Sequence, residues 1–204
     1  NTKVWKLTTE CVDYRQGILY SVGREMNVLF SMELCTGKTK VMLQMPNEDK
    51  LEQRLYNGLS IDGDNLALIP YNAKQLWIYN FTNMKWDFID ISSWVNPNMN
   101  GKFVGGKLIN GRVYLFGYTY KGILVVDIKT KRIKQLFKEK DQDKYVFWGQ
   151  NTVTIEEKIF VISMLTSEMI CINTYTDEYE IIKINGLDDC ENNSNGGLIY
   201  ENGK

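Results

Sequence analysis

Short apolar runs recur along the chain, and each follows a turn signal of one pair of residues. In the third repeat, for example, the run 113–116 follows Asn110-Gly111. The turn signals are Gln16-Gly17, Asp62-Gly63, Asn110-Gly111, Glu156-Glu157 and Asn202-Gly203, and from residue 17 they step by 46, 48, 46 and 46 residues. Asn-Gly and Asp-Gly pairs favour tight hairpins, because both central residues of a type I′ turn need a positive φ. The pattern therefore predicts β-hairpins at a fixed period.

A second marker keeps the same period. Threonines recur with steps of 46, 48 and 46 residues, at Thr36, Thr82, Thr130 and Thr176. Each follows an acid or amide at short distance: Glu33, Asn80, Asp127 and Asn173. Asx and Thr side chains cap turns by bonding nearby backbone N–H groups, so these residues predict a turn between two strands. Two markers in one register establish a true internal repeat.

Each repeat reads as four strands, here named a, b, c and d. In the third repeat we expect strand a at 103–109, b at 112–116, c at 122–127 and d at 132–137. The four repeats span 8–45, 55–91, 103–137 and 147–184. Long polar loops separate them, at 46–54, 92–102, 138–146 and 185–195.

The faces of these sheets decide the fold class. Strand b is apolar almost continuously, so both faces of each sheet must be covered. A lone four-stranded sheet cannot cover itself, but sheets stacked around an axis cover one another. Four antiparallel strands in about 45 residues are typical of a β-propeller blade. A flat β-sandwich is the competing interpretation, and it offers no reason for a fixed period. We therefore predict an all-β propeller segment, 1–204, of four four-stranded antiparallel blades.

The two ends predict further blades. Residues 1–7 read as strand d of a preceding blade, and 196–204 read as strand a of a following blade. The outer faces of the first and fourth blades are then expected to be covered by further blades of the same protein or by a partner.

Two segments resemble the kelch repeat. The stretch from Tyr79 to Trp86 is similar to the kelch segment in which a Tyr precedes an Asx–Thr turn and a Trp follows, and 110–117 is similar to its strand b ending in glycine. The chain departs from the kelch double glycine, where it has Gly23, Pro70, Gly117 and Ser163. The resemblance implies a degenerate kelch-like β-propeller.

Charge and residue types exclude several functions. The chain has 24 basic and 25 acidic residues, so it has no basic excess to bind nucleic acid or a membrane surface. It has no histidine, which removes Ser-His-Asp catalysis and His-ligated zinc. No motif indicates a catalytic residue, a metal ligand or a cofactor. The four cysteines stand far apart and are expected to be free thiols, which favours a reducing compartment such as the cytoplasm.

One rim of the propeller carries the predicted binding residues. Loops b–c and d–a share this rim and vary in sequence, whereas the opposite turns are short and stereotyped. Tyrosine, tryptophan and arginine are enriched at binding hot spots. The predicted rim residues are Arg24, Tyr71, Trp94, Tyr118, Tyr120, Tyr145 and Trp148. By contrast, Trp5, Trp77 and Trp86 lie within strands and are expected in the inter-blade core.

Two functions follow from these observations. The first is a non-catalytic binding module that presents this rim to a protein or peptide. The alternative is carbohydrate recognition, or the propeller part of a glycan-processing enzyme, because aromatic rings stack on sugars. Glycan binding separates the two.

Overall fold

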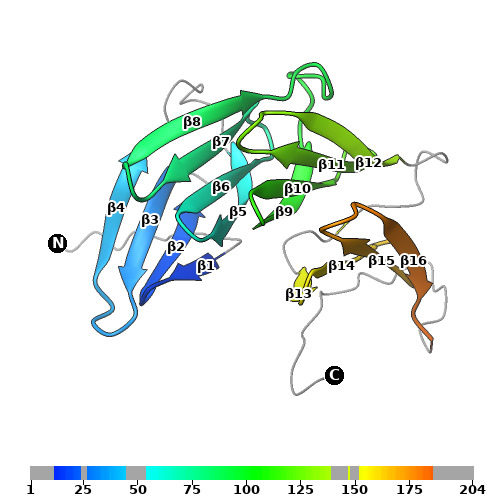
Figure 1. Ribbon diagram of the computed structural model, residues 1–204. Helices are drawn as coiled ribbons and strands as arrows, with labels where there is room; N and C mark the ends of the chain where they lie inside the picture. The colour runs from blue at the N-terminus through cyan, green and yellow to red at the C-terminus, as the bar shows by residue number, and fades with distance from the viewer. Residues whose placement is uncertain (1–11, 24–26, 45–53, 139–146, 148–151, 186–204) are drawn as a thin grey trace.

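The computed structural model describes residues 12–23, 27–44, 54–138, 147 and 152–185, and these residues form four separate four-stranded sheets (Figure 1). The first blade contains β1 (Val12–Arg15), β2 (Ile18–Gly23), β3 (Val28–Glu33) and β4 (Thr39–Gln44). The second contains β5 (Tyr56–Asp62), β6 (Asn65–Pro70), β7 (Gln75–Asn80) and β8 (Lys85–Asp90). The third contains β9 (Phe103–Ile109), β10 (Arg112–Gly117), β11 (Gly122–Asp127) and β12 (Ile133–Lys138). The fourth contains β13 (Val153–Ile155), β14 (Lys158–Ile162), β15 (Glu168–Asn173) and β16 (Tyr179–Lys183).

Every blade is an antiparallel meander in which each strand pairs with the next along the chain. Figure 1 shows the four sheets fanned in an arc, with β1, β5, β9 and β13 toward the inside and β4, β8, β12 and β16 outside. The described residues contain no helix, and hence none long and apolar enough to span a membrane. The predicted all-β architecture of four-stranded blades is confirmed for this part of the chain. The predicted end strands 1–7 and 196–204 lie outside the described residues.

The predicted turn chemistry explains where the strands end. Asn110 and Gly111 both have positive φ, 51° and 72°, as a type I′ hairpin requires. In the second blade Asp62 pairs with Asn65, so the two turn residues are Gly63 and Asp64, one residue later than predicted.

The turn between the third and fourth strands of a blade is named here the third turn, and in the second, third and fourth blades an Asx side chain caps it. Asp127 Oδ1 accepts from the N–H groups of Lys129 and Thr130, at 3.0 and 2.7 Å. The backbone N–H of Thr130 holds the pKa of the Asp127 carboxyl below its ordinary value. Asn80 and Asn173 cap their third turns in the same way, through the N–H groups two and three residues on.

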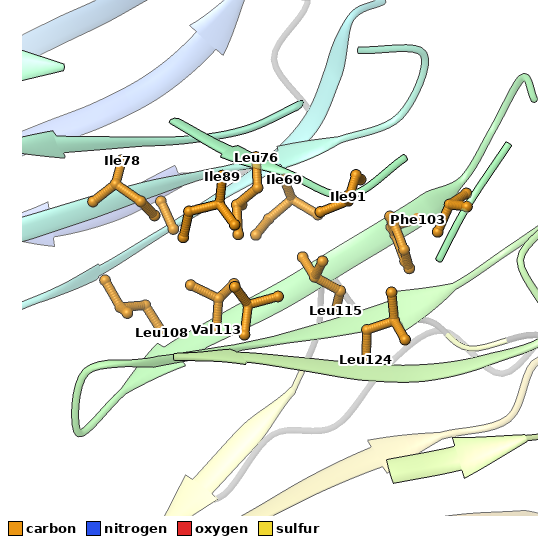
Figure 2. Close-up of a cluster of buried hydrophobic side chains, with 13 residues drawn as sticks. Ile69, Leu76, Ile78, Ile89, Ile91, Phe103, Leu108, Val113, Leu115 and Leu124 are labelled. Carbon is orange, nitrogen blue, oxygen red and sulfur yellow. The ribbon is translucent and has the colours of Figure 1, made fainter. Parts of the chain in front are cut away.

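Each pair of neighbouring blades encloses one apolar cluster, and the second and third sheets each contribute to a different cluster from each of their faces. In β6, Leu66 and Leu68 pack toward the first blade, whereas Ala67 and Ile69 pack toward the third. Figure 2 shows the cluster between the second and third blades, where Ile69 and Leu76 lie opposite Leu115. A third cluster joins the third blade to the fourth. Successive side chains along a strand point to opposite faces of the sheet, and both faces are apolar. A single blade therefore cannot bury both of its apolar faces.

Two details of packing agree with the sequence. A Cβ on Gly106 in β9 would lie 2.7 Å from both Ile69 Cδ1 and the Tyr114 carbonyl, so only glycine fits this crowded inner strand. Trp77 is buried, and its ring meets the ring of Trp86 edge-on at 6.2 Å. The predicted core positions of Trp77 and Trp86 are thus confirmed, while Trp5 lies outside the described residues.

Candidate binding rim

The loops after the second strands (71–74 and 118–121) and before the first strands (91–102) meet at one rim of the second and third blades. Of the seven predicted rim residues, this part of the chain includes Tyr71, Trp94, Tyr118 and Tyr120. Arg24, Tyr145 and Trp148 lie outside the described residues.

Tyr71 and Tyr118 form a pair across two blades. Their ring centroids are 6.4 Å apart, and the rings are tilted by 32°. Each backbone N–H donates to the residue before the inner strand of its own blade, Tyr71 to the Leu55 carbonyl at 2.8 Å and Tyr118 to the Lys102 carbonyl at 2.9 Å. The two tyrosines thus occupy equivalent places in successive repeats. Tyr118 is 39% exposed, so the pair reaches solvent.

Gly101 lies beneath this pair. It adopts a left-handed conformation, with φ +64°, and a Cβ there would lie 3.2 Å from Tyr118 Cδ1 and 3.3 Å from Tyr71 Cζ. Its N–H donates to Asn72 Oδ1 at 3.0 Å. Glycine is needed here both for its backbone and for the space that the two rings occupy.

Arg54 adds a cation to the pair. Its guanidinium carbon lies 4.5 Å from the centroid of the Tyr71 ring, within cation–π range. Its Nε donates to Asn57 Oδ1 at 3.1 Å, and its φ of 59° matches the left-handed φ of Gly101. Sequence reasoning missed Arg54. The available signal was its position in the repeat. Arg54 directly precedes Leu55, and Gly101 directly precedes Lys102, and the carbonyls of Leu55 and Lys102 accept the tyrosine N–H groups.

Lys102 anchors the loops and was also missed. It is fully buried, and its Nζ donates to the carbonyls of Asn72 at 3.0 Å and Met99 at 2.6 Å. Its own N–H donates to the Tyr71 carbonyl at 2.8 Å. A charged group is tolerated inside a protein when backbone acceptors replace its water. Lys102 therefore ties the 91–102 loop to the loop that carries Tyr71.

Tyr120 and Trp94 are the other two predicted rim residues in the described part of the chain, and they differ in their surroundings. The Tyr120 ring packs on Phe103 at 5.4 Å, and its hydroxyl accepts a hydrogen bond from Gln135 Nε2. Burial raises the pKa of the Tyr120 hydroxyl above its ordinary value. Trp94 is 41% exposed, and its backbone N–H donates to the Ile91 carbonyl at 3.0 Å. Tyr120 thus supports the rim from within, whereas Trp94 presents a surface.

The charge of the described rim loops is one-sided. The segments 71–74, 91–102 and 118–121 contain Lys74, Lys102 and Lys121 and no Asp or Glu, and Arg54 stands beside them. Within the described residues, no group of three or more Cys, Asp or Glu side chains could hold a metal ion. The exposed part of this rim is aromatic, with Trp94 and Tyr118 41% and 39% exposed, and the buried Lys102 does not contribute to its surface.

Comparison with solved structures supports the fold. The chain is similar to the β-propeller domain of Cps50 (Swd1) from Myceliophteria thermophila, with TM-score 0.63 and 13% identity over 89% of this chain and 57% of that one. It is similar to U3-55K, with TM-score 0.62 and 9% identity over 89% of this chain and 53% of that one. The computationally designed Ika8 protein matches with TM-score 0.61 and 8% identity, over 93% and 52% of the two chains.

The chain has a β-propeller fold. It spans little more than half of each of these three structures. No protein-family model matches the propeller segment, and no curated protein does. The kelch-like character of its repeats stays a prediction.

Proposed function

We propose that the propeller segment is a non-catalytic, kelch-like binding module, and that it recognises a protein or peptide through Tyr71, Tyr118 and Arg54. The observation that carries this proposal is the tyrosine pair over Gly101, with the Arg54 guanidinium 4.5 Å from the Tyr71 ring. Tyrosine and arginine, together with tryptophan, are enriched at binding hot spots. The loops are already held by internal hydrogen bonds, so little ordering entropy is lost on binding.

The exposed rings indicate the kind of partner. Tyr118 is 39% exposed, and its ring lies beside that of Tyr71. A peptide with an aromatic or apolar side chain would pack on both rings. We therefore assign a peptide segment with an exposed aromatic or apolar side chain as the partner class.

A peptide array tests this function. We expect peptides with an exposed aromatic or apolar side chain to bind the wild-type chain, and Tyr71→Ala and Arg54→Ala to weaken that binding about tenfold or more, as truncation of a hot-spot residue does. Tyr175→Ala is the matched control, because Tyr175 is 71% exposed on the third turn of the fourth blade, away from this rim. Equal binding by all variants would reject the proposal.

Carbohydrate recognition is the second candidate, as a lectin-like module or as the propeller part of a glycan-processing enzyme. It is favoured by one observation, the 39% exposure of Tyr118, whose ring lies beside that of Tyr71. Sugar rings stack on such surfaces. A glycan array would show binding that Tyr118→Ala abolishes and Tyr175→Ala preserves. A chain that binds no glycan at millimolar concentration would exclude this function.

A further inference from the structure

The third turns of successive blades place one residue in the same left-handed conformation. These residues are Gly37, Met84, Lys131 and Asp177, with φ of 67°, 56°, 58° and 56°. In the third and fourth blades this residue is charged and reaches back to the preceding blade. The third turn is thus a point where one blade attaches to its neighbour.

The two attachments use the same positions with exchanged charges. Lys131 Nζ donates to Asp87 Oδ1 at 2.7 Å and to the Phe88 carbonyl at 3.2 Å, on β8 of the second blade. Asp177 Oδ2 accepts from Lys134 Nζ at 2.5 Å, on β12 of the third blade. Asp87 pairs with Ile78, and Lys134 pairs with Val125, in the corresponding register of β7–β8 and β11–β12. At the interface of the second and third blades the lysine is on the turn and the acid is on the preceding blade. At the interface of the third and fourth blades the acid is on the turn and the lysine is on the preceding blade.

The third blade binds the turn residue of the fourth blade, Asp177, in a cavity. A cavity of about 360 Å³ on its side toward the fourth blade is lined by Arg112, Val125, Asp127 and Lys134, and Asp177 enters it. Asp177 also accepts from Arg112 Nη1 and from the Tyr114 hydroxyl, both at 2.9 Å. Three donors thus surround one carboxylate whose side chain is only 10% exposed.

The fourth blade carries the same cavity on its outgoing face, the face turned away from the third blade. Its volume is about 460 Å³, and its described lining residues all belong to the fourth blade: Lys158, Cys171, Asn173, Glu178, Tyr179 and Glu180. Cys171 pairs with Glu180 as Val125 pairs with Lys134, so Glu180 occupies the place of Lys134. Two carboxylates and one ammonium line this cavity, the reverse of the basic cavity that holds Asp177.

We propose that this outgoing face docks a further blade whose third turn carries a lysine or arginine at the left-handed position, directed at Glu180. The apolar part of the outgoing face fits the same occupant. Phe116 and Ile123 pair with each other on the face of the third blade that packs against the fourth, and Ile162 and Met169 are the corresponding pair on the outgoing face of the fourth blade. A second copy of the chain would bring Gly37 to this position and no charge. The surface is distinct from the tyrosine rim.

A cyclised peptide of residues 122–138 tests the docking, because it carries the β11–β12 hairpin and Lys131. Its hairpin is first verified by NMR, and it is then titrated into the full chain beside a Lys131→Asp peptide. We expect the lysine peptide to bind about tenfold more tightly than the aspartate peptide, and Glu180→Lys in the chain to invert that preference. Glu33→Lys makes the same charge change in the first blade and should leave the preference intact.

Three results would overturn the proposal. One is a folded lysine peptide that does not bind at millimolar concentration. Another is binding that ignores the charge of the peptide or of residue 180. The third is a dimer of the chain in sedimentation velocity that Glu180→Lys weakens, because a second copy would then occupy the face.

Discussion

Asp13 and Ser60 make the same hydrogen bond at successive blade interfaces. Asp13 Oδ2 accepts from the Ile61 N–H at 2.7 Å, and Ser60 Oγ accepts from the Leu108 N–H at 3.0 Å, each bond spanning 48 residues of the chain. Both join the inner strand of one blade to the inner strand of the next. A side chain therefore links neighbouring sheets where no backbone ladder does.

Ser60→Ala should destabilise the chain. The variant leaves the N–H of the buried Leu108 without its acceptor, and such a loss costs about 1–2 kcal/mol of unfolding free energy. Urea unfolding followed by tryptophan fluorescence measures the change. Ser93→Ala, at an exposed loop position, is the control and should unfold at the wild-type midpoint. A wild-type midpoint for Ser60→Ala would contradict the role of this bond.

Lys107→Ser should strengthen the interface between the third and fourth blades. Lys107 occupies the place of Asp13 and Ser60 in β9, three residues before the a–b turn, but an ammonium cannot accept a hydrogen bond. A serine there could accept from the Thr154 N–H, with an expected gain of about 1 kcal/mol. The same urea titration measures the change in unfolding free energy. A lower midpoint would show that the hydrogen bond made by Asp13 and Ser60 has no counterpart between the third and fourth blades.

Thr154→Val should also stabilise the fourth blade. Thr154 Oγ1 is buried and has no hydrogen-bond partner among the described residues. Replacing the unpaired hydroxyl by a methyl group of similar shape is expected to raise the unfolding free energy by about 1 kcal/mol. Thr174→Val is the matched control, since Thr174 Oγ1 donates to the Glu157 carbonyl at 2.8 Å and its loss should destabilise. Equal effects of the two variants would refute the distinction.

Tyr114 should make stability fall at high pH. Burial first, and then its hydrogen bond to Asp177, raise the pKa of the Tyr114 hydroxyl far above its ordinary value of 10. The stabilisation is thus fully present below pH 10 and is lost as the pH rises further, by at most about 1.4 kcal/mol per pH unit for one proton. Tyr114→Phe should show a shallower decline between pH 10 and 11.5 in denaturant titrations. An identical slope in both proteins would disprove the assignment.

Gly101→Ala should damage the rim beyond its effect on the backbone. Gly101 and Gly111 both have positive φ, 64° and 72°, so alanine strains either site by about 1 kcal/mol. Only at Gly101 does the added Cβ meet the rings of Tyr71 and Tyr118, whereas nothing lies within 4 Å at Gly111. We expect Gly101→Ala to lose peptide binding and Gly111→Ala to retain it. If Gly101→Ala retained peptide binding, the binding would not depend on the arrangement of Tyr71 and Tyr118.

Local chemistry made most of the fold predictable. The left-handed turn at Asn110 and Gly111 and the Asp127 cap depend on residues within a few positions of one another, so their spacing reports the strands directly. The two apolar faces of each strand then require stacking, which predicts the blades. The rim was predicted in part, because Tyr71 and Tyr118 stand at equivalent places of the repeat.

Contacts between repeats could be decided only in three dimensions. Nothing local indicates that Asp177 enters a cavity of the preceding blade, because that contact depends on how two sheets are placed. Lys102 reads as a surface residue of a polar loop, yet it is buried where the second blade has Leu55. Turn and strand preferences act over a few residues, whereas burial and charge pairing are settled only when separate sheets pack together.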